Sequence, residues 1–247
     1  MERLVEVCCG SYADAVAAYK NHADRVELNG ALHAGGLTPS LASLILTKMH
    51  TNIKVITMIR PRGAGFIYSD EDFEVMKMDT RILLENGADG IAFGILDQDG
   101  KIDVKRCKEI ISIVKEFEKE VVFHRAYDCL EDPYEGMETL IAMGVDRVLT
   151  SGLQAKAPEG KELLKELQEK YGDRIEILAG GGVNATNARD LIEYAGISQV
   201  HSSCKAYVED KTTVGENISY ACLQGEHELE YDIVDGNLVD ALVKSVK

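Results

Sequence analysis

His22-Ala23-Asp24-Arg25-Val26, Gly87-Ala88-Asp89-Gly90-Ile91, Gly144-Val145-Asp146-Arg147-Val148 and, more loosely, Gly196-Ile197-Ser198-Gln199-Val200 repeat one short pattern four times along the chain. A glycine just past a helix can adopt the left-handed conformation that ends it. The aspartate or serine then caps the turn, and a β-branched residue begins a strand. Each copy therefore predicts a junction between a helix and the strand that follows it.

The spacing of these junctions predicts the fold. The intervals from Asp24 to Asp89, to Asp146 and to Ser198 each leave room for two strand–helix units, because one crossover with its strands takes roughly 30 residues. The repeats thus predict eight units. The length of 247 residues also matches the roughly 250 residues of a typical (β/α)8 barrel, which forms one domain. We expect a single TIM-type barrel domain over residues 1–247.

Apolar runs and helical periodicity alternate along most of the chain. The predicted strands are Leu4–Cys9, Val26–Asn29, Val55–Arg60, Ile91–Gly94, Val121–Arg125, Val148–Ser151, Ile175–Gly180 and Gln199–Ser203. The predicted helices include Ser40–His50, Asp70–Glu85, Asp103–Glu118, Pro133–Met143, Gly160–Tyr171, Thr186–Tyr194 and a closing helix at Asn237–Val246. Residues 204–235 show little periodicity, which is compatible with an extended loop over the barrel mouth or with irregular packing.

Composition excludes several classes of partner. The chain carries 42 acidic and 27 basic residues, a net charge of −15, which disfavours nucleic acid and anionic membrane surfaces. No apolar stretch is long enough for a membrane helix. No signal peptide precedes the first predicted strand and the six cysteines lack CxxC spacing, so we expect a cytoplasmic protein with reduced thiols. The oligomeric state stays open, with a homo-oligomer as one option.

Several predicted strands contain polar residues where a parallel sheet is usually apolar. They are Glu6 and Cys8, Glu27 and Asn29, Arg60, His124 and His201. All except Glu6 and Glu27 lie at strand C-terminal ends, where the active sites of such barrels are built. A buried ion pair between Glu27 and Arg60 would account for part of this pattern, but it would not account for the two histidines.

Two clusters at strand ends indicate an anion site. Arg60 and Arg62 flank a proline, and Arg125 follows His124; the donors of a guanidinium suit carboxylate or phosphate. His124 is a candidate general acid or base, with Asp128 or Glu27 available to orient it. The simpler alternative is a loop salt bridge between Arg125 and Asp128, with His124 a core residue.

Glycines and serines follow the last three predicted strands. Thr150-Ser151-Gly152, Gly180-Gly181-Gly182 and His201-Ser202-Ser203 end these strands in turn. Glycines let backbone N–H groups approach an anion, and loops after strands 7 and 8 often bind phosphate in barrels. We therefore include Ser151, Ser203 and the three glycines from Gly180 in the candidate anion site, although a glycine run also serves as a plain turn.

The chain resembles the CutC family, named for copper homeostasis. The resemblance is carried by these motifs in order: Glu27-Leu28, Gly35-Gly36-Leu37-Thr38-Pro39-Ser40, Ile59-Arg60-Pro61-Arg62-Gly63, Tyr68-Ser69-Asp70, Phe123-His124-Arg125-Ala126, Leu149-Thr150-Ser151-Gly152 and His201-Ser202. It implies a (β/α)8 barrel in the cytoplasm with a role in copper handling. It also implies that Cys8 is one of the family's copper ligands.

One departure from the family concerns copper directly. Asn29 stands where the resemblance implies a second cysteine, and Cu(I) prefers soft thiolate or thioether ligands. We therefore expect weak Cu(I) binding that changes little on Cys8→Ser. The first hypothesis is copper handling through Cys8 with a neighbour such as Met58 or His201.

The second hypothesis is an enzyme that acts on a small phosphorylated or carboxylated substrate. Its catalytic candidates are Glu27, His124, Asp128 and His201. A barrel serving only as an interaction scaffold is a third reading, which the cost of isolated buried charges disfavours.

Overall fold

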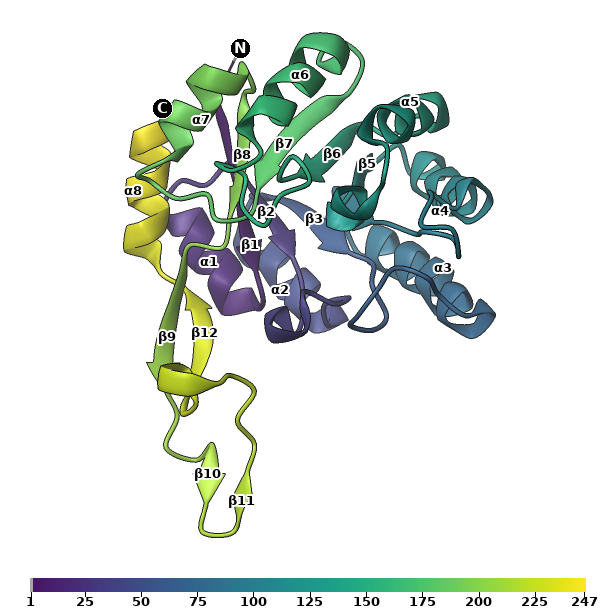
Figure 1. Cartoon of the computed structure of the whole chain (residues 1–247). Helices are drawn as coiled ribbons and strands as arrows, with labels where there is room; N and C mark the ends of the chain where they lie inside the picture. The colour runs from purple at the N-terminus through teal and green to yellow at the C-terminus, as the bar shows by residue number, and fades with distance from the viewer. Residues whose placement is uncertain (1) are drawn as a thin grey trace.

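Eight parallel strands form a closed barrel in chain order, and the helices surround it (Figure 1). The computed structural model describes residues 2–247. The predicted (β/α)8 architecture is confirmed. The strands are β1 (Leu4–Cys9), β2 (Arg25–Leu28), β3 (Lys54–Met58), β4 (Gly90–Phe93), β5 (Glu120–Phe123), β6 (Arg147–Thr150), β7 (Glu176–Gly180) and β8 (Gln199–Ser202).

The helices begin at the caps that the sequence supplies. Ser11, Ser40, Ser69, Asp103 and Asp132 each accept a hydrogen bond from a backbone N–H of the first helical turn, which satisfies donors that the helix leaves free. The helices are α1 (Tyr12–Lys20), α2 (Leu41–His50), α3 (Asp70–Glu85), α4 (Val104–Glu116), α5 (Pro133–Met143), α6 (Lys161–Tyr171), α7 (Ala188–Ala195) and α8 (Gly236–Val246). Helix α8 packs against α1, α7 and β1 and completes the outer ring.

The aspartate of the repeated pattern has a different contact from the one predicted. Asp24, Asp89 and Asp146 precede β2, β4 and β6, but their carboxylates accept hydrogen bonds from Val5, Val55 and Val121 N–H at 2.8, 2.8 and 2.7 Å. Each carboxylate thus ties the start of one strand to the preceding strand instead of capping its own turn. The glycines behave as expected, because Gly87, Gly144 and Gly196 have φ of 95°, 79° and 70°.

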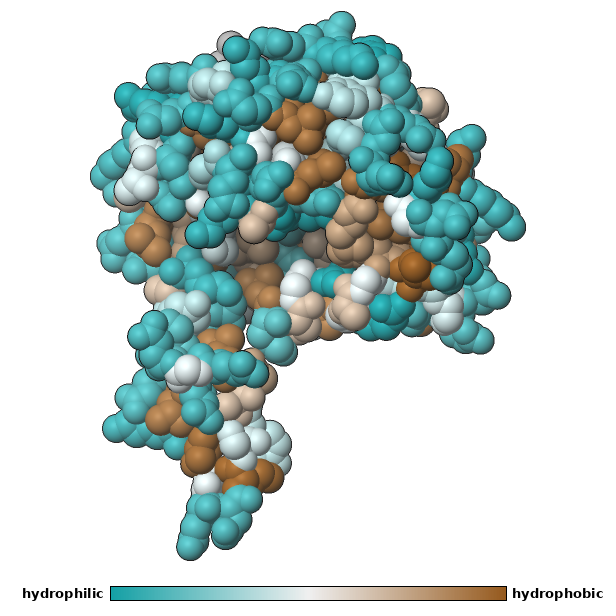
Figure 2. Space-filling model, viewed as in Figure 1, coloured by the Kyte–Doolittle hydropathy of each residue, from teal (hydrophilic) through white to brown (hydrophobic). Residues whose placement is uncertain are grey.

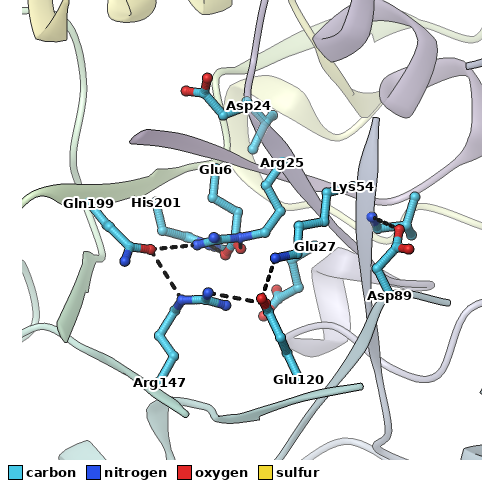
Figure 3. A network of polar contacts seen from close by, with 12 residues as sticks. Glu6, Asp24, Arg25, Glu27, Lys54, Asp89, Glu120, Arg147, Gln199 and His201 are labelled. Atoms are coloured by element: carbon cyan, nitrogen blue, oxygen red, sulfur yellow. Dashed lines mark hydrogen bonds and ion pairs between the residues drawn. The ribbon is translucent and has the colours of Figure 1, made fainter. Parts of the chain in front are cut away.

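A buried polar network fills the N-terminal end of the barrel (Figure 3). Arg25 contacts Glu6 and donates to Gln199 at 2.8 Å. Arg147 donates to Gln199 and to Glu120, both at 3.1 Å. Because Arg25, Glu120, Arg147 and Gln199 are the first residues of their strands, the network closes this end of the lumen. Any cavity along the barrel axis is therefore left to the C-terminal end.

Residues 205–234 form an arm that extends away from the barrel (Figure 1). Its base is an antiparallel pair of β9 (Lys205–Glu209) and β12 (Glu230–Val234), and its tip pairs β10 (Val214–Gly215) with β11 (Ile218–Ser219). Asp14 of α1 fixes the base by accepting from Val234 N–H at 2.8 Å. The segment without periodicity is thus a projecting hairpin.

Within residues 2–247, no helix has the length and apolar character needed to cross a membrane.

Candidate functional site

A cavity of about 190 Å³ lies at the C-terminal end of the barrel. It is lined by Cys8, Glu27, Asn29, Leu32, Gly35, Met58, Arg60, Phe66, His124, Arg125, Leu149 and His201. Figure 2 shows a hollow near the centre of the barrel face that it presents, with the arm projecting from the edge. Arg60, His124 and His201 therefore share one end of the barrel, as the sequence predicted.

One side of the cavity gathers a thiol, a carboxylate and an imidazole. The candidate ligand atoms of Cys8, Glu27 and His201 all lie within 4.8 Å of one another. Strand register produces this cluster, because Cys8 pairs with Glu27 between β1 and β2, and Glu6 pairs with His201 between β1 and β8. Glu6 and Cys8 are two residues apart on β1, so both side chains face the lumen.

Glu6 orients the imidazole of His201. Its carboxylate lies 2.7 Å from His201 Nδ1 and also contacts Arg25. Burial by itself would raise the pKa of Glu6, but Arg25 and His201 outweigh burial and hold it well below the usual value. Burial would likewise lower the pKa of His201, but hydrogen bonding with Cys8 and Glu6 raises it well above the usual range. Because Glu6 engages Nδ1, the other ring nitrogen, Nε2, is the candidate ligand atom of His201.

Asn29 supports the other two members of the cluster. Its Nδ2 donates to Glu27 Oε2 at 3.0 Å and approaches Cys8 Sγ at 3.5 Å. Burial raises the pKa of both Glu27 and Cys8. The amide oxygen of Asn29 is buried and has no partner within residues 2–247. It is thus a further acceptor beside the cluster, at the position where the family resemblance implies a thiol.

Arg60 does not pair with Glu27, contrary to one interpretation of the sequence. Its Nη1 donates to the carbonyl oxygens of Gly35 and Gly36 at 2.9 and 3.1 Å, and its Nη2 donates to Ala64 O at 2.5 Å. The loop after β2 folds over the guanidinium, with Gly35 at φ 90°. Among the described residues, no carboxylate lies within 4.0 Å of this buried charge. The lumen ion pair of β2 is formed by Arg25 instead.

His124 is held as a neutral imidazole. Its Nδ1 accepts a hydrogen bond from Ala126 N–H at 3.1 Å, so the ring proton is on Nε2. Burial and the nearby Arg60 charge lower its pKa to about 3. Within residues 2–247, His124 has no hydrogen bond to Asp128 or to Glu27. Asp128 instead contacts Arg125 and Thr150, and Glu27 contacts Asn29. A neutral imidazole is a hydrogen-bond donor at pH 7, not a proton donor.

Arg125 and Asp128 form a salt bridge, which was the simpler alternative that the sequence left open. Arg125 Nε donates to Asp128 at 2.7 Å, and its Nη2 donates to Ser151 Oγ at 2.7 Å. Asp128 also accepts from Thr150 Oγ1 at 2.5 Å. Ser151 and Asp128 therefore position the Arg125 guanidinium and do not themselves line the cavity.

The remaining candidate anion-binding residues lie outside the cavity lining. Arg62 pairs with Asp72 at 3.0 Å and is half-exposed. Gly180, Gly181, Gly182 and Ser203 are likewise absent from the lining. Gly181 packs against the Arg125 guanidinium, and α7 begins only at Ala188. The loop after β7 therefore lies against the Arg125 guanidinium and does not line the cavity.

Glu6, Phe66 and Leu149 contribute to the site but were not assigned to it from the sequence. Glu6 was placed on the same strand face as Cys8, but its contact with His201 depends on the β1–β8 register. Phe66 and Leu149 form apolar walls of the cavity, and no sequence pattern distinguishes them from core residues.

The comparisons with known proteins agree with this geometry. The model of the CutC family matches residues 3–206. The chain belongs to the CutC family. A CutC family protein from Treponema denticola is 44% identical over 217 residues, which cover 87% of each chain. The human copper homeostasis protein cutC homolog is 38% identical over 249 residues, covering 98% of this chain and 90% of the human protein.

Solved structures support the same assignment. A copper homeostasis protein CutC from Streptococcus agalactiae superposes with a TM-score of 0.77 at 31% identity, covering 81% of this chain and 98% of its own. Phosphoribosylanthranilate isomerase from Pyrococcus furiosus shares the barrel fold, with a TM-score of 0.57 at 17% identity. The family model ends at residue 206, so most of the arm lies beyond it.

Proposed function

We propose that this CutC family protein handles copper and binds the metal ion between Cys8, Glu27 and His201. The observation that carries the proposal is the convergence of these three ligand atoms within 4.8 Å at the barrel mouth. The hydrogen bond that His201 Nδ1–H donates to the Glu6 carboxylate adds the outer acceptor that commonly orients a metal-binding histidine. A role in copper homeostasis is also the one for which the human and mouse relatives are named.

The donor set fits copper better than magnesium or calcium. A thiol and an imidazole suit copper and zinc, whereas magnesium and calcium take oxygen ligands. The thioether of Met58 also lines the cavity. With one thiol instead of two, we expect Cu(I) affinity below that of a dithiolate site. Binding would require Cys8 and His201 to release protons.

The test is a competition titration with Cu(I) under reducing conditions. Because Glu27 and His201 lie beside Cys8 as co-ligands, Cys8→Ser and His201→Asn should each weaken Cu(I) binding. The sequence alone, by contrast, predicted that Cys8→Ser would change Cu(I) affinity little. Cys222→Ser is the matched control, since Cys222 is exposed on the arm. Undetectable binding, or equal affinity in the wild type and both site variants, would contradict the proposal. Circular dichroism should confirm that each variant is folded.

The cellular location forms part of the same proposal. All six cysteines are free thiols, as expected for a reducing compartment. The free thiols support our proposal of a cytoplasmic location.

A further inference from the structure

We infer that the side of the cavity opposite the Cys8 cluster binds a small carboxylate, through the Nε2–H of His124 and the guanidinium of Arg125, beside the buried charge of Arg60. This site is separate from the proposed metal ligands, and Arg60, His124 and Arg125 lie in the segments that follow β3 and β5.

His124 offers a hydrogen bond that the protein does not use. The residue is 4% exposed and lines the cavity. Its Nε2 is buried without a partner within residues 2–247. Since Nδ1 accepts from Ala126 N–H, Nε2 carries the proton and must donate. Leaving a buried donor unpaired is costly, and most such groups in folded proteins have an acceptor. A ligand oxygen would supply one.

Arg60 contributes a buried positive charge that no acidic residue within residues 2–247 compensates. Its guanidinium is bonded to backbone carbonyls and stacks 5.2 Å from the ring centroid of Phe66. Carbonyl oxygens satisfy hydrogen bonds but carry no net charge, and the Nε of Arg60 still has no partner among the described residues. A positive charge in a cavity of low dielectric constant attracts an anion.

Arg125 supplies the second donor. Its Nε donates a hydrogen bond to Asp128 and its Nη2 donates one to Ser151. These two bonds fix the plane of the guanidinium at the cavity edge. Its Nη1 has no hydrogen-bond partner among residues 2–247. Phe66 and Leu149 provide apolar walls on the same side. Fixed donors beside apolar walls suit a short carbon chain that ends in a carboxylate.

The geometry favours carboxylate over phosphate. The volume of about 190 Å³ lies below the roughly 300–1,000 Å³ of pockets for larger ligands. Phosphate sites in barrels draw on backbone N–H groups of glycine loops and on helix N-termini, but the loop from Gly180 to Gly182 does not line this cavity. The donors that do line it belong to the side chains of His124, Arg60 and Arg125.

The experiment is a calorimetric titration of the full chain with pyruvate, inorganic phosphate and uncharged pyruvamide, in EDTA so that metal plays no part. We expect pyruvate to bind and pyruvamide to bind at least about tenfold more weakly, because a hydrogen bond to a charged group is the stronger kind. Inorganic phosphate should also bind at least about tenfold more weakly than pyruvate, because the glycine loop that would offer it backbone N–H groups does not line the cavity. His124→Phe, which removes the N–H, and Arg125→Gln should each weaken pyruvate binding about tenfold or more.

Arg62→Gln is the matched control. Like Arg125, Arg62 is salt-bridged, with side-chain exposure of 42% against 40%, but it lies outside the cavity lining. His124→Gln keeps an N–H donor, so it should retain more pyruvate binding than His124→Phe; if His124→Phe does not fold, Arg125→Gln carries the test. Absence of pyruvate binding, binding unchanged in folded His124→Phe or in Arg125→Gln, or equal binding of phosphate would overturn the inference. Cys8→Ser should leave pyruvate binding intact, so failure of the metal proposal would be seen separately.

Discussion

Acidification should destabilise this protein through His124 in particular. The folded state keeps the imidazole neutral, because burial and Arg60 lower its pKa from 6.5 to about 3. In the unfolded chain the same ring takes up a proton near pH 6.5. Between these two values the unfolded state binds more protons, so the free energy of unfolding must fall as the pH falls.

The size of this effect follows from the two pKa values. One pKa unit corresponds to about 1.4 kcal/mol. From pH 6.5 to pH 4.5, His124 should remove about 2 kcal/mol from the free energy of unfolding, and by pH 3 about 4 kcal/mol. Losses of this size are a large part of the stability of an ordinary domain.

The assay is urea unfolding of the wild type and of His124→Gln between pH 7.5 and pH 4.5. Both proteins share every other titrating group, so the difference between their two curves isolates His124. We expect the stability advantage of the wild type over the variant to shrink by about 3 kcal/mol over this range. His33→Gln is the control, since His33 is an exposed histidine on the loop after β2. Parallel curves for the wild type and His124→Gln would refute the reasoning.

Two further predictions concern the barrel base and the arm. Glu6→Gln should lower the free energy of unfolding, measured by chemical denaturation, by about 3–5 kcal/mol, because it leaves Arg25 without its buried partner. Glu193→Gln is the control. It should change the free energy of unfolding by less than about 0.5 kcal/mol, because the contact of Glu193 with Arg3 is exposed. A larger loss of stability for Glu193→Gln, or no loss for Glu6→Gln, would contradict a stabilising role of the buried polar network at the N-terminal end of the barrel. Replacing residues 211–228 by a short glycine-containing turn should leave the thermal melting temperature nearly unchanged, since most of these residues are exposed and loop shortening changes the closure entropy little. A substantial drop in melting temperature would show that the arm supports the barrel.

The barrel could be predicted from the sequence because its signals are local. A left-handed glycine, an aspartate and a β-branched residue each express their preference within a few residues, and α3 and α5 occur at the predicted bounds Asp70–Glu85 and Pro133–Met143. Alternation along a strand likewise assigned Glu6 and Cys8 to the same face before any contact was known.

The choice of partners across the barrel could not be predicted in this way. Glu27 and Arg25 lie two positions apart on β2, and either could have paired with a charge on a neighbouring strand. The strand register places Cys8 beside Glu27 and His201 beside Glu6. The Arg60 guanidinium instead donates hydrogen bonds to backbone carbonyls of the loop after β2. Such contacts join residues up to 195 positions apart, so only the closed barrel decides them.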